Sequence, residues 1–198
     1  MVGCGRKVPG NMQLLSPNII GPAWGLSELA LSLFKRSKAG ATSRDRNSLS
    51  IIWVVNLAAV AAGVFLAYHA PGWRLAGWVP KQSLGGAFFV AGFMLRWYSI
   101  IYLGRFFTVN VAIAEDHQVV QSGPYRWVRH PSYSGGMLML LGFGISMGNA
   151  ASLLVMMGPC VWVMLWRVRI EEAALRQGLG EPYAAYMRRT WRLSPLIY

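Results

Sequence analysis

The sequence predicts an all-α integral membrane protein, a bundle of about five transmembrane helices. Three observations support this fold class. The chain of 198 residues is 55% hydrophobic and only 13% charged, with a mean hydropathy of +0.38, whereas a soluble domain is about 25% charged. Its apolar residues form runs of helical length. No alternation of strands and helices is visible, which argues against a doubly wound nucleotide-binding sheet.

Five apolar runs define the expected helices, and a bilayer core requires roughly 20 such residues. They cover residues 19–34, 49–69, 84–103, 133–147 and 150–166. The first is short and is interrupted by Pro22. The last two are at the short end for spanning and are separated only by Gly148 and Asn149, so we expect a tight helical hairpin. Glycines would let the two helices of this hairpin approach closely, at positions 135, 136, 142 and 144.

Two of these runs contain an ionisable residue, Glu28 in the first and Arg96 in the third. A charge inside the bilayer is costly, so such residues reach toward the interface or pair with one another. We expect Arg96 to extend to the nearer membrane face or to point into the bundle, with Glu28 as its candidate partner.

The formal charge of +12 comes from 19 basic and 7 acidic residues. Fourteen basic residues fall on one predicted side of the membrane, in segments 35–46, 105–129 and 167–192, and four fall on the other. Because Lys and Arg collect in cytoplasmic loops, we predict an external N-terminus and a cytoplasmic C-terminus. Basic residues of this kind contact anionic lipid headgroups. Membrane lipids are therefore expected partners, and a nucleic-acid partner is not.

The two cysteines, Cys4 and Cys160, form no CxxC motif, and no Cys/His spacing of a zinc site occurs. We predict neither a disulfide nor a metal site.

Polar residues gather in two places. HQVV (117–120) and SGPYRWVRHPSYSGG (122–136) precede the fourth run, with Pro131 near the helix start, where its missing N–H costs nothing. RVRIEEAAL (167–175) follows the fifth run, and there Arg167 and Glu171 share a helix face, as Arg169 and Glu172 nearly do. Read separately, the first is typical of an interfacial belt and the second of a salt-bridged helix exit.

Read together, these segments and LGEPYAAYMRR (179–189) resemble the isoprenylcysteine carboxyl methyltransferase family, which is related to membrane phospholipid methyltransferases. The resemblance covers residues 102–198. It implies one membrane methyltransferase domain over residues 1–198, with N-terminal membrane helices at 1–103. The half at 104–198 would bind the cofactor and carry catalysis, through a cytoplasmic loop and a C-terminal helix.

The resemblance also implies a cofactor, S-adenosyl-L-methionine, and roles for individual residues. The implied catalytic residues are Arg167, which would bind the acceptor, and Glu171. One departure is visible: the family's upstream glutamine has no counterpart here, where TVNVAIAED (108–116) offers only Asn110. The implied cofactor-binding residues are His117, Gln118, Val119, Val120, Tyr125, His130, Pro131, Ser132, Tyr133 and Glu171.

The implied reaction is methyl transfer to a lipophilic small-molecule or prenylated acceptor at the cytoplasmic face, above all O-methylation of an isoprenylcysteine-like carboxylate. Arg167 would hold such a carboxylate in a bidentate pair. Four alternatives remain open: O-methylation of a lipophilic phenol or enol, N-methylation of a phospholipid, S-methylation of a thiol, and a non-catalytic membrane protein. The short chain resembles prokaryotic members, so a prokaryotic inner membrane is the expected location.

Overall fold

The computed structural model describes residues 16–34, 48–75, 81–107 and 118–194. Within these residues the protein is helical, and its only β-type pairings are two isolated bridges, Arg74 with Asn149 and Val128 with Trp191. The all-α prediction is therefore confirmed. The long helices are α1 (Pro17–Phe34), α2 (Ser48–His69), α3 (Lys81–Leu103), α4 (Pro131–Met147) and α5 (Ala150–Leu179), with the short α6 (Glu181–Met187) and 3₁₀ turns η2 (Pro71–Trp73), η3 (Gly104–Phe106) and η4 (Gly123–Arg126).

The helix boundaries agree with the apolar runs to within a few residues, except in α5. That helix does not end near Trp166 but continues for 30 residues to Leu179, so RVRIEEAAL belongs to the same rod as the apolar run before it. Helices α2, α3 and α5 are long and apolar enough to cross a membrane by length and composition. Helices α1 and α4 have 18 and 17 residues. A total of five spans stays a prediction.

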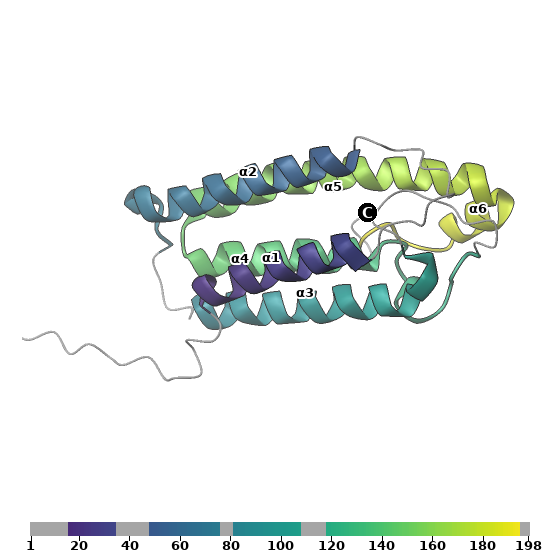
Figure 1. Ribbon diagram of the computed structural model, residues 1–198, viewed down its shortest axis with the longest axis horizontal. Coiled ribbons are helices and arrows are strands. Elements are labelled where there is room, and N and C mark those ends of the chain that lie inside the picture. The colour runs from purple at the N-terminus through teal and green to yellow at the C-terminus, as the bar shows by residue number, and fades with distance from the viewer. Residues whose placement is uncertain (1–15, 35–47, 76–80, 108–117, 195–198) are drawn as a thin grey trace, which may run out of the picture.

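The bundle is made of two helix pairs, α3 with α4 and α2 with α5 (Figure 1). Glycines bring α3 and α4 together: a Cβ built on Gly92 would lie 2.6 Å from the Gly135 carbonyl oxygen, and one built on Gly85 would lie 2.5 Å from that of Gly142. The expectation that the α4 glycines serve the hairpin with α5 is wrong for Gly135 and Gly142, which face α3. It is confirmed for Gly144, where an added Cβ would lie 2.6 Å from Leu153 Cδ1 of α5.

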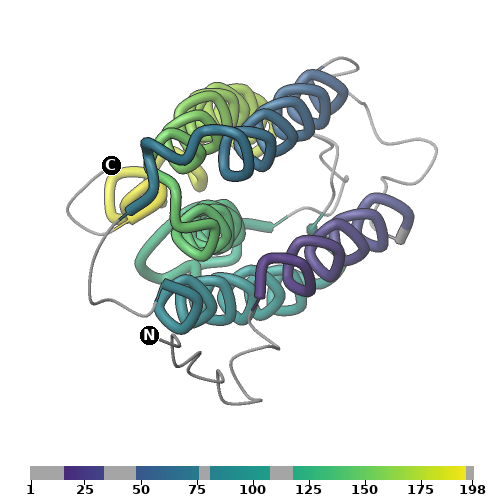
Figure 2. Tube along the Cα trace, turned by 90° about the vertical axis from the view of Figure 1, so that its left-hand side faces the viewer, coloured from purple at the N-terminus to yellow at the C-terminus, as the bar shows by residue number. Residues whose placement is uncertain are grey.

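Helix α1 lies against α4 and α3, on the side away from α5 (Figure 2). Trp24 of α1 packs edge-on against Phe89 of α3 and Phe143 of α4, with ring centroids 6.3 and 6.1 Å apart. Around these rings the helices share a small apolar core. Its buried members are Ile20, Ala59, Phe89, Met139, Leu140, Phe143, Met156 and Cys160. Many other large apolar side chains of α2, α3 and α5 are exposed, as expected for helices that face lipid.

The expected pairing of Glu28 with Arg96 is confirmed. Arg96 Nη2 lies 2.7 Å from Glu28 Oε2, and Trp24 Nε1 donates to the other carboxylate oxygen at 3.3 Å. Arg96 also donates from Nη1 to the Ser132 carbonyl at 3.1 Å. One intramembrane ion pair therefore connects α1 and α3 to the first turn of α4, where the polar motif begins.

Candidate functional site

The polar motifs meet at one end of the bundle, where α4 begins and α5 leaves the apolar region (Figure 1). Backbone pairing holds the segment before α4 in place. Arg129 N donates to the Trp191 carbonyl at 2.8 Å, His130 N donates to the Arg192 carbonyl at 3.1 Å, and Trp191 N donates to the Trp127 carbonyl at 3.0 Å. The C-terminal segment thus runs beside the RHPSY motif, sixty residues away in sequence. The local sequence pattern does not predict this pairing.

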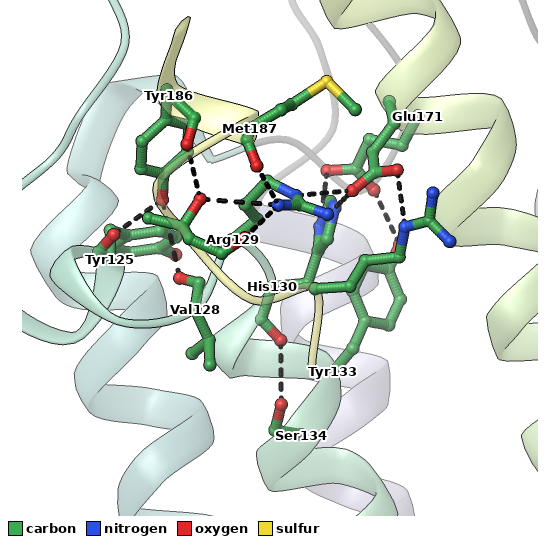
Figure 3. Close-up of polar contacts among 12 residues, drawn as sticks. Tyr125, Val128, Arg129, His130, Tyr133, Ser134, Glu171, Tyr186 and Met187 are labelled. Atoms are coloured by element: carbon green, nitrogen blue, oxygen red, sulfur yellow. Dashed lines mark hydrogen bonds and ion pairs between the residues drawn. The ribbon is translucent and has the colours of Figure 1, made fainter. Parts of the chain in front are cut away.

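Tyr133 and Glu171 form the centre of the cluster (Figure 3). The Tyr133 hydroxyl donates to Glu171 Oε2 at 2.9 Å and also lies within hydrogen-bonding reach of the Arg167 guanidinium. One phenol from the first turn of α4 therefore bridges two residues that lie one turn apart on α5. The Glu171 side chain stays 29% exposed, so its carboxylate remains accessible to a ligand.

His130 lies beside this centre and is 4% exposed. Its Nδ1 is 3.9 Å from Glu171 Oε1, and its Nε2 is 3.4 Å from Glu172 Oε1. Within the described residues Nε2 has no hydrogen-bond partner of good geometry. The ring therefore lies between the two glutamates of α5. His130 is also the N-cap residue of α4, and Pro131 begins the helix as the sequence predicts.

Arg167 is 1% exposed and donates from Nη1 to the Ser48 hydroxyl at the start of α2. A buried guanidinium in an apolar helix is costly unless polar groups surround it. Arg167 therefore ties α2 to the cluster while its charge stays next to Tyr133 and Glu171.

Glu172 is a site residue that the sequence reasoning missed. Its carboxylate is 5% exposed and lies between two guanidinium groups, 2.8 Å from Arg129 Nε and 2.7 Å from Arg192 Nε. The expected neighbour on its own helix, Arg169, is exposed instead. The Glu-Glu pair was a visible signal, but the partners come from segments far away in the sequence.

Tyr125 is buried, and its hydroxyl donates to the Ser99 carbonyl of α3 at 3.1 Å. Tyr186 of α6 donates to the Tyr125 carbonyl at 2.7 Å. Burial raises the pKa of both phenols, so both remain protonated donors at any physiological pH. The Tyr125 hydroxyl therefore attaches η4 to α3. Because this hydroxyl is already hydrogen-bonded, only the other atoms of Tyr125 could contact a ligand.

The other predicted cofactor residues lie outside the cluster, and His117 lies outside the described residues. Gln118 is exposed, and Val119 and Val120 are half-buried ahead of η4. Ser132 is buried, and its carbonyl accepts from Arg96.

The residues present fit S-adenosylmethionine, the cofactor implied by the sequence. The buried imidazole of His130 and the partly exposed carboxylate of Glu171 offer a polar site for its ribose hydroxyls or ammonium group. Tyr133 and Arg167 add a phenol and a permanent cation at the same place.

The fold and site together define a class of protein, a helical membrane protein with one polar cluster at the end of an apolar bundle. Comparison with known proteins shows which family the chain resembles. Residues 85–177 match the model of the isoprenylcysteine carboxyl methyltransferase (ICMT) family. The resemblance inferred from the sequence motifs is thereby confirmed, and it begins earlier than expected, within α3.

Two relatives by sequence are named protein-S-isoprenylcysteine O-methyltransferases, and a third has no assigned function. Protein-S-isoprenylcysteine O-methyltransferase B of Arabidopsis thaliana is 32% identical over 122 residues, which cover 60% of this chain and 60% of that protein. The Schizosaccharomyces pombe enzyme is 33% identical over 123 residues, covering 59% of this chain and 50% of that protein. An uncharacterized protein of Haemophilus influenzae is 29% identical over 96 residues, covering 48% and 55%. The chain thus spans 60% or less of these relatives.

The fold has a solved counterpart. The structure of the eukaryotic intramembrane Ras methyltransferase ICMT superposes with a TM-score of 0.64 at 22% identity, covering 91% of this chain and 65% of that one. The architecture is therefore that of a multi-pass integral membrane protein. Plant and fungal relatives stand beside the bacterial one, which weakens the expectation of a prokaryotic membrane.

Proposed function

We propose that this protein is a methyltransferase that uses S-adenosylmethionine to methylate the carboxylate of an isoprenylcysteine-like acceptor. The observation that carries the proposal is the junction of His130, Tyr133, Arg167 and Glu171 at one end of an apolar bundle. The family match and the names of the relatives support the same reaction.

Glu171 and His130 are the cofactor side of this site. The Glu171 carboxylate is accessible, and Tyr133 orients it through a 2.9 Å hydrogen bond. His130 is fixed at the N-cap of α4 by backbone pairing with Arg192, so its imidazole has a defined direction. Such prior fixing lowers the entropy cost of ordering a ligand. Gln118, Val119, Val120, Tyr125, Pro131 and Ser132 would complete the site, together with His117.

Arg167 is the acceptor side. It is a permanent cation in the apolar part of the bundle, and a carboxylate pairs with a guanidinium through two parallel hydrogen bonds. The lipophilic part of the acceptor would remain in the surrounding apolar region while Arg167 holds its carboxylate at the Tyr133 end of the site.

When bound, S-adenosylmethionine supplies a methyl group already activated by its sulfonium, so the protein mainly has to orient its two ligands, which is worth on the order of 7–11 kcal/mol of barrier. A carboxylate acceptor needs no general base. A phenol or enol acceptor needs one, and Tyr133 and His130 are the nearest candidates.

The test is methyl transfer by the purified chain in detergent, with a labelled methyl donor. The acceptor panel contains a prenylated cysteine, a long-chain alkylphenol, a phospholipid and a small thiol. We expect the prenylated cysteine to be methylated, and Glu171→Gln to lower the signal. Glu181→Gln is the matched control, because Glu181 is an exposed carboxylate that pairs only with Arg188 among the described residues. If only another acceptor is methylated, that acceptor replaces the isoprenylcysteine as the proposed substrate class. If no acceptor is methylated and S-adenosylhomocysteine does not bind, the proposal of a methyltransferase is refuted.

A further inference from the structure

The bundle has a cavity of about 570 Å³ at the end opposite to the polar cluster. This distal cavity lies where α1 and α3 begin and where α2 and α4 end. Helix α4 runs from the polar cluster to the cavity, so its 17 residues separate the two by about 25 Å. The lining residues are Ser16, Pro17, Asn18, Ala67, Tyr68, Arg74, Lys81, Gln82, Ser146, Met147 and Gly148.

The distal cavity is cationic. Arg74 and Lys81 line it, and no carboxylate does. The sequence makes this imbalance firm, since no Asp or Glu occurs in residues 1–27, 46–114 or 117–170, which contain every lining residue. Among the residues that the structure describes, no carboxylate lines the cavity to offset these two charges, so an anion from outside would find an unneutralised site.

Hydrogen bonds and close packing hold the segments that carry Arg74 and Lys81 in place. The fully buried Asn149 donates from Nδ2 to the Ala70 carbonyl at 2.8 Å, and Leu75 N donates to the Gly148 carbonyl at 2.9 Å. These bonds fix the segment that carries Arg74 to the turn between α4 and α5. At Gly148, whose φ is +66°, the missing side chain leaves room for the Lys81 stem, since an added Cβ would lie 3.2 Å from Lys81 Cδ.

The surroundings contribute further donors and place the cavity at the membrane surface. Gln82 presents a side-chain amide, and the Tyr68 hydroxyl donates to Asn18 Oδ1 at 3.4 Å, which joins α2 and α1 across the opening. Helices α2 and α3 have the length and composition to cross a bilayer, so the ends that line the cavity lie at headgroup level. The exposed Tyr68 and Trp73 are residue types that prefer this level.

We propose that the distal cavity binds a phosphate group through Arg74, Lys81 and Gln82, and that the headgroup of a neighbouring phospholipid supplies it. Phosphate matches the site chemically, because guanidinium, ammonium and amide groups all donate to its oxygens. The site is separate from the proposed methyl-transfer centre and does not depend on it.

The experiment measures thermal unfolding of the full chain in a non-ionic detergent. The probes are a short-chain phosphatidylglycerol, inorganic phosphate, and a short-chain diacylglycerol without phosphate. The test variant is Arg74→Gln with Lys81→Gln. The control is Arg169→Gln with Arg176→Gln, which removes the same charge from two exposed residues of α5 at the other end.

We expect phosphatidylglycerol to raise the unfolding temperature in a saturable way for the wild type and the control, and diacylglycerol to have no effect. The test variant should bind phosphatidylglycerol about tenfold or more weakly, since two charged hydrogen-bond donors are lost. Arg74→Lys with Lys81 intact should retain most of the binding. An equal response to inorganic phosphate at the same concentration would make the soluble anion the source and keep the phosphate site.

Equal phosphatidylglycerol responses in the wild type and the test variant would overturn the proposal, as would equal losses in the test and control variants. A second measurement does not depend on the folding of any variant. Native mass spectrometry of the wild type, offered both lipids together, should show one retained phosphatidylglycerol in preference to diacylglycerol. Retention without preference would also overturn the phosphate site.

Discussion

At the scale of single residues, the site is organised around Tyr133. Its hydroxyl lies between Glu171, to which it donates at 2.9 Å, and Arg167. Arg167 is almost fully buried and Glu171 is partly exposed. Two residues one helical turn apart thus have different environments, and this difference is the basis for giving them different roles.

We predict that Arg167→Ala abolishes methyl transfer while the affinity for S-adenosylhomocysteine changes little, because Arg167 would bind only the acceptor. Glu171→Ala should lower both turnover and affinity, the latter by about 1.5–3 kcal/mol, the range for hydrogen bonds to charged groups. Titration calorimetry gives the affinity, and the labelled transfer assay gives the turnover.

Thermal melting must accompany this comparison, because loss of a buried charge partner destabilises a protein. If folded Arg167→Ala protein loses affinity for S-adenosylhomocysteine as severely as Glu171→Ala protein, both residues belong to the cofactor site. The acceptor-binding group would then have to be sought elsewhere. Arg129 and Arg96 are less suitable, since Glu172 and Glu28 already pair with them.

At the scale of elements, ion pairs and backbone bonds attach the C-terminal segment to the helices. Glu172 of α5 pairs with Arg129 before α4 and with Arg192 in the C-terminal segment. Arg129 also donates to the carbonyls of Met187 and Thr190. The cluster is therefore held together by three segments, and Glu172 is their common carboxylate.

We predict that Glu172→Gln destabilises this docking by about 3–5 kcal/mol, because it leaves Arg129 without its carboxylate in a buried place. Limited trypsin digestion should then cleave after Arg188, Arg189 or Arg192 much faster than in the wild type. Glu181→Gln, which removes an exposed ion pair, should leave the cleavage rate unchanged. Equal protection of all three proteins would show that Glu172 does not hold the segment.

The α3–α4 contact gives a prediction about a pair of elements. Gly92→Ala should lower stability by about 1–3 kcal/mol, the range for overpacked sites, since its Cβ would meet Gly135 backbone at 2.6 Å. The matched control is Gly158→Ala in α5, where an added Cβ meets nothing within 4 Å. That control should gain stability from helix propensity. Thermal unfolding in detergent compares them, and a Gly92→Ala protein as stable as the control would contradict the close contact.

At the scale of the whole molecule, the polar cluster and the distal cavity occupy opposite ends of the bundle. In the topology predicted from the sequence, fourteen basic residues fall on the side of the cluster and four fall on the other side. The asymmetry predicts that the cluster faces the cytoplasm.

Reporter fusions test this orientation. We expect a fusion after Tyr198 to report the cytoplasm and one inserted between Ala70 and Lys81 to report the opposite side, because an odd number of spans separates them. If both fusions report the same side, one of the predicted spans does not cross the membrane, and the cluster and the distal cavity face the same side of it. If the fusion after Tyr198 reports the outside and the other fusion reports the cytoplasm, the number of spans is retained and the orientation of the bundle is reversed.

The sequence alone predicted the fold class, the resemblance to the isoprenylcysteine carboxyl methyltransferase family and the helix boundaries except the end of α5, because apolar content, run length and motif order are local properties of the chain. It also proposed Tyr133, His130, Arg167 and Glu171 as site residues, through the resemblance of their motifs to that family, and the structure brings these four side chains together. Only the tertiary structure decided which surfaces meet. It paired Glu172 with Arg129 and Arg192, turned Gly135 and Gly142 of α4 toward α3, and gathered Arg74 and Lys81 around one cavity. These contacts join residues far apart in sequence, and their energies depend on burial and distance, which no local pattern contains.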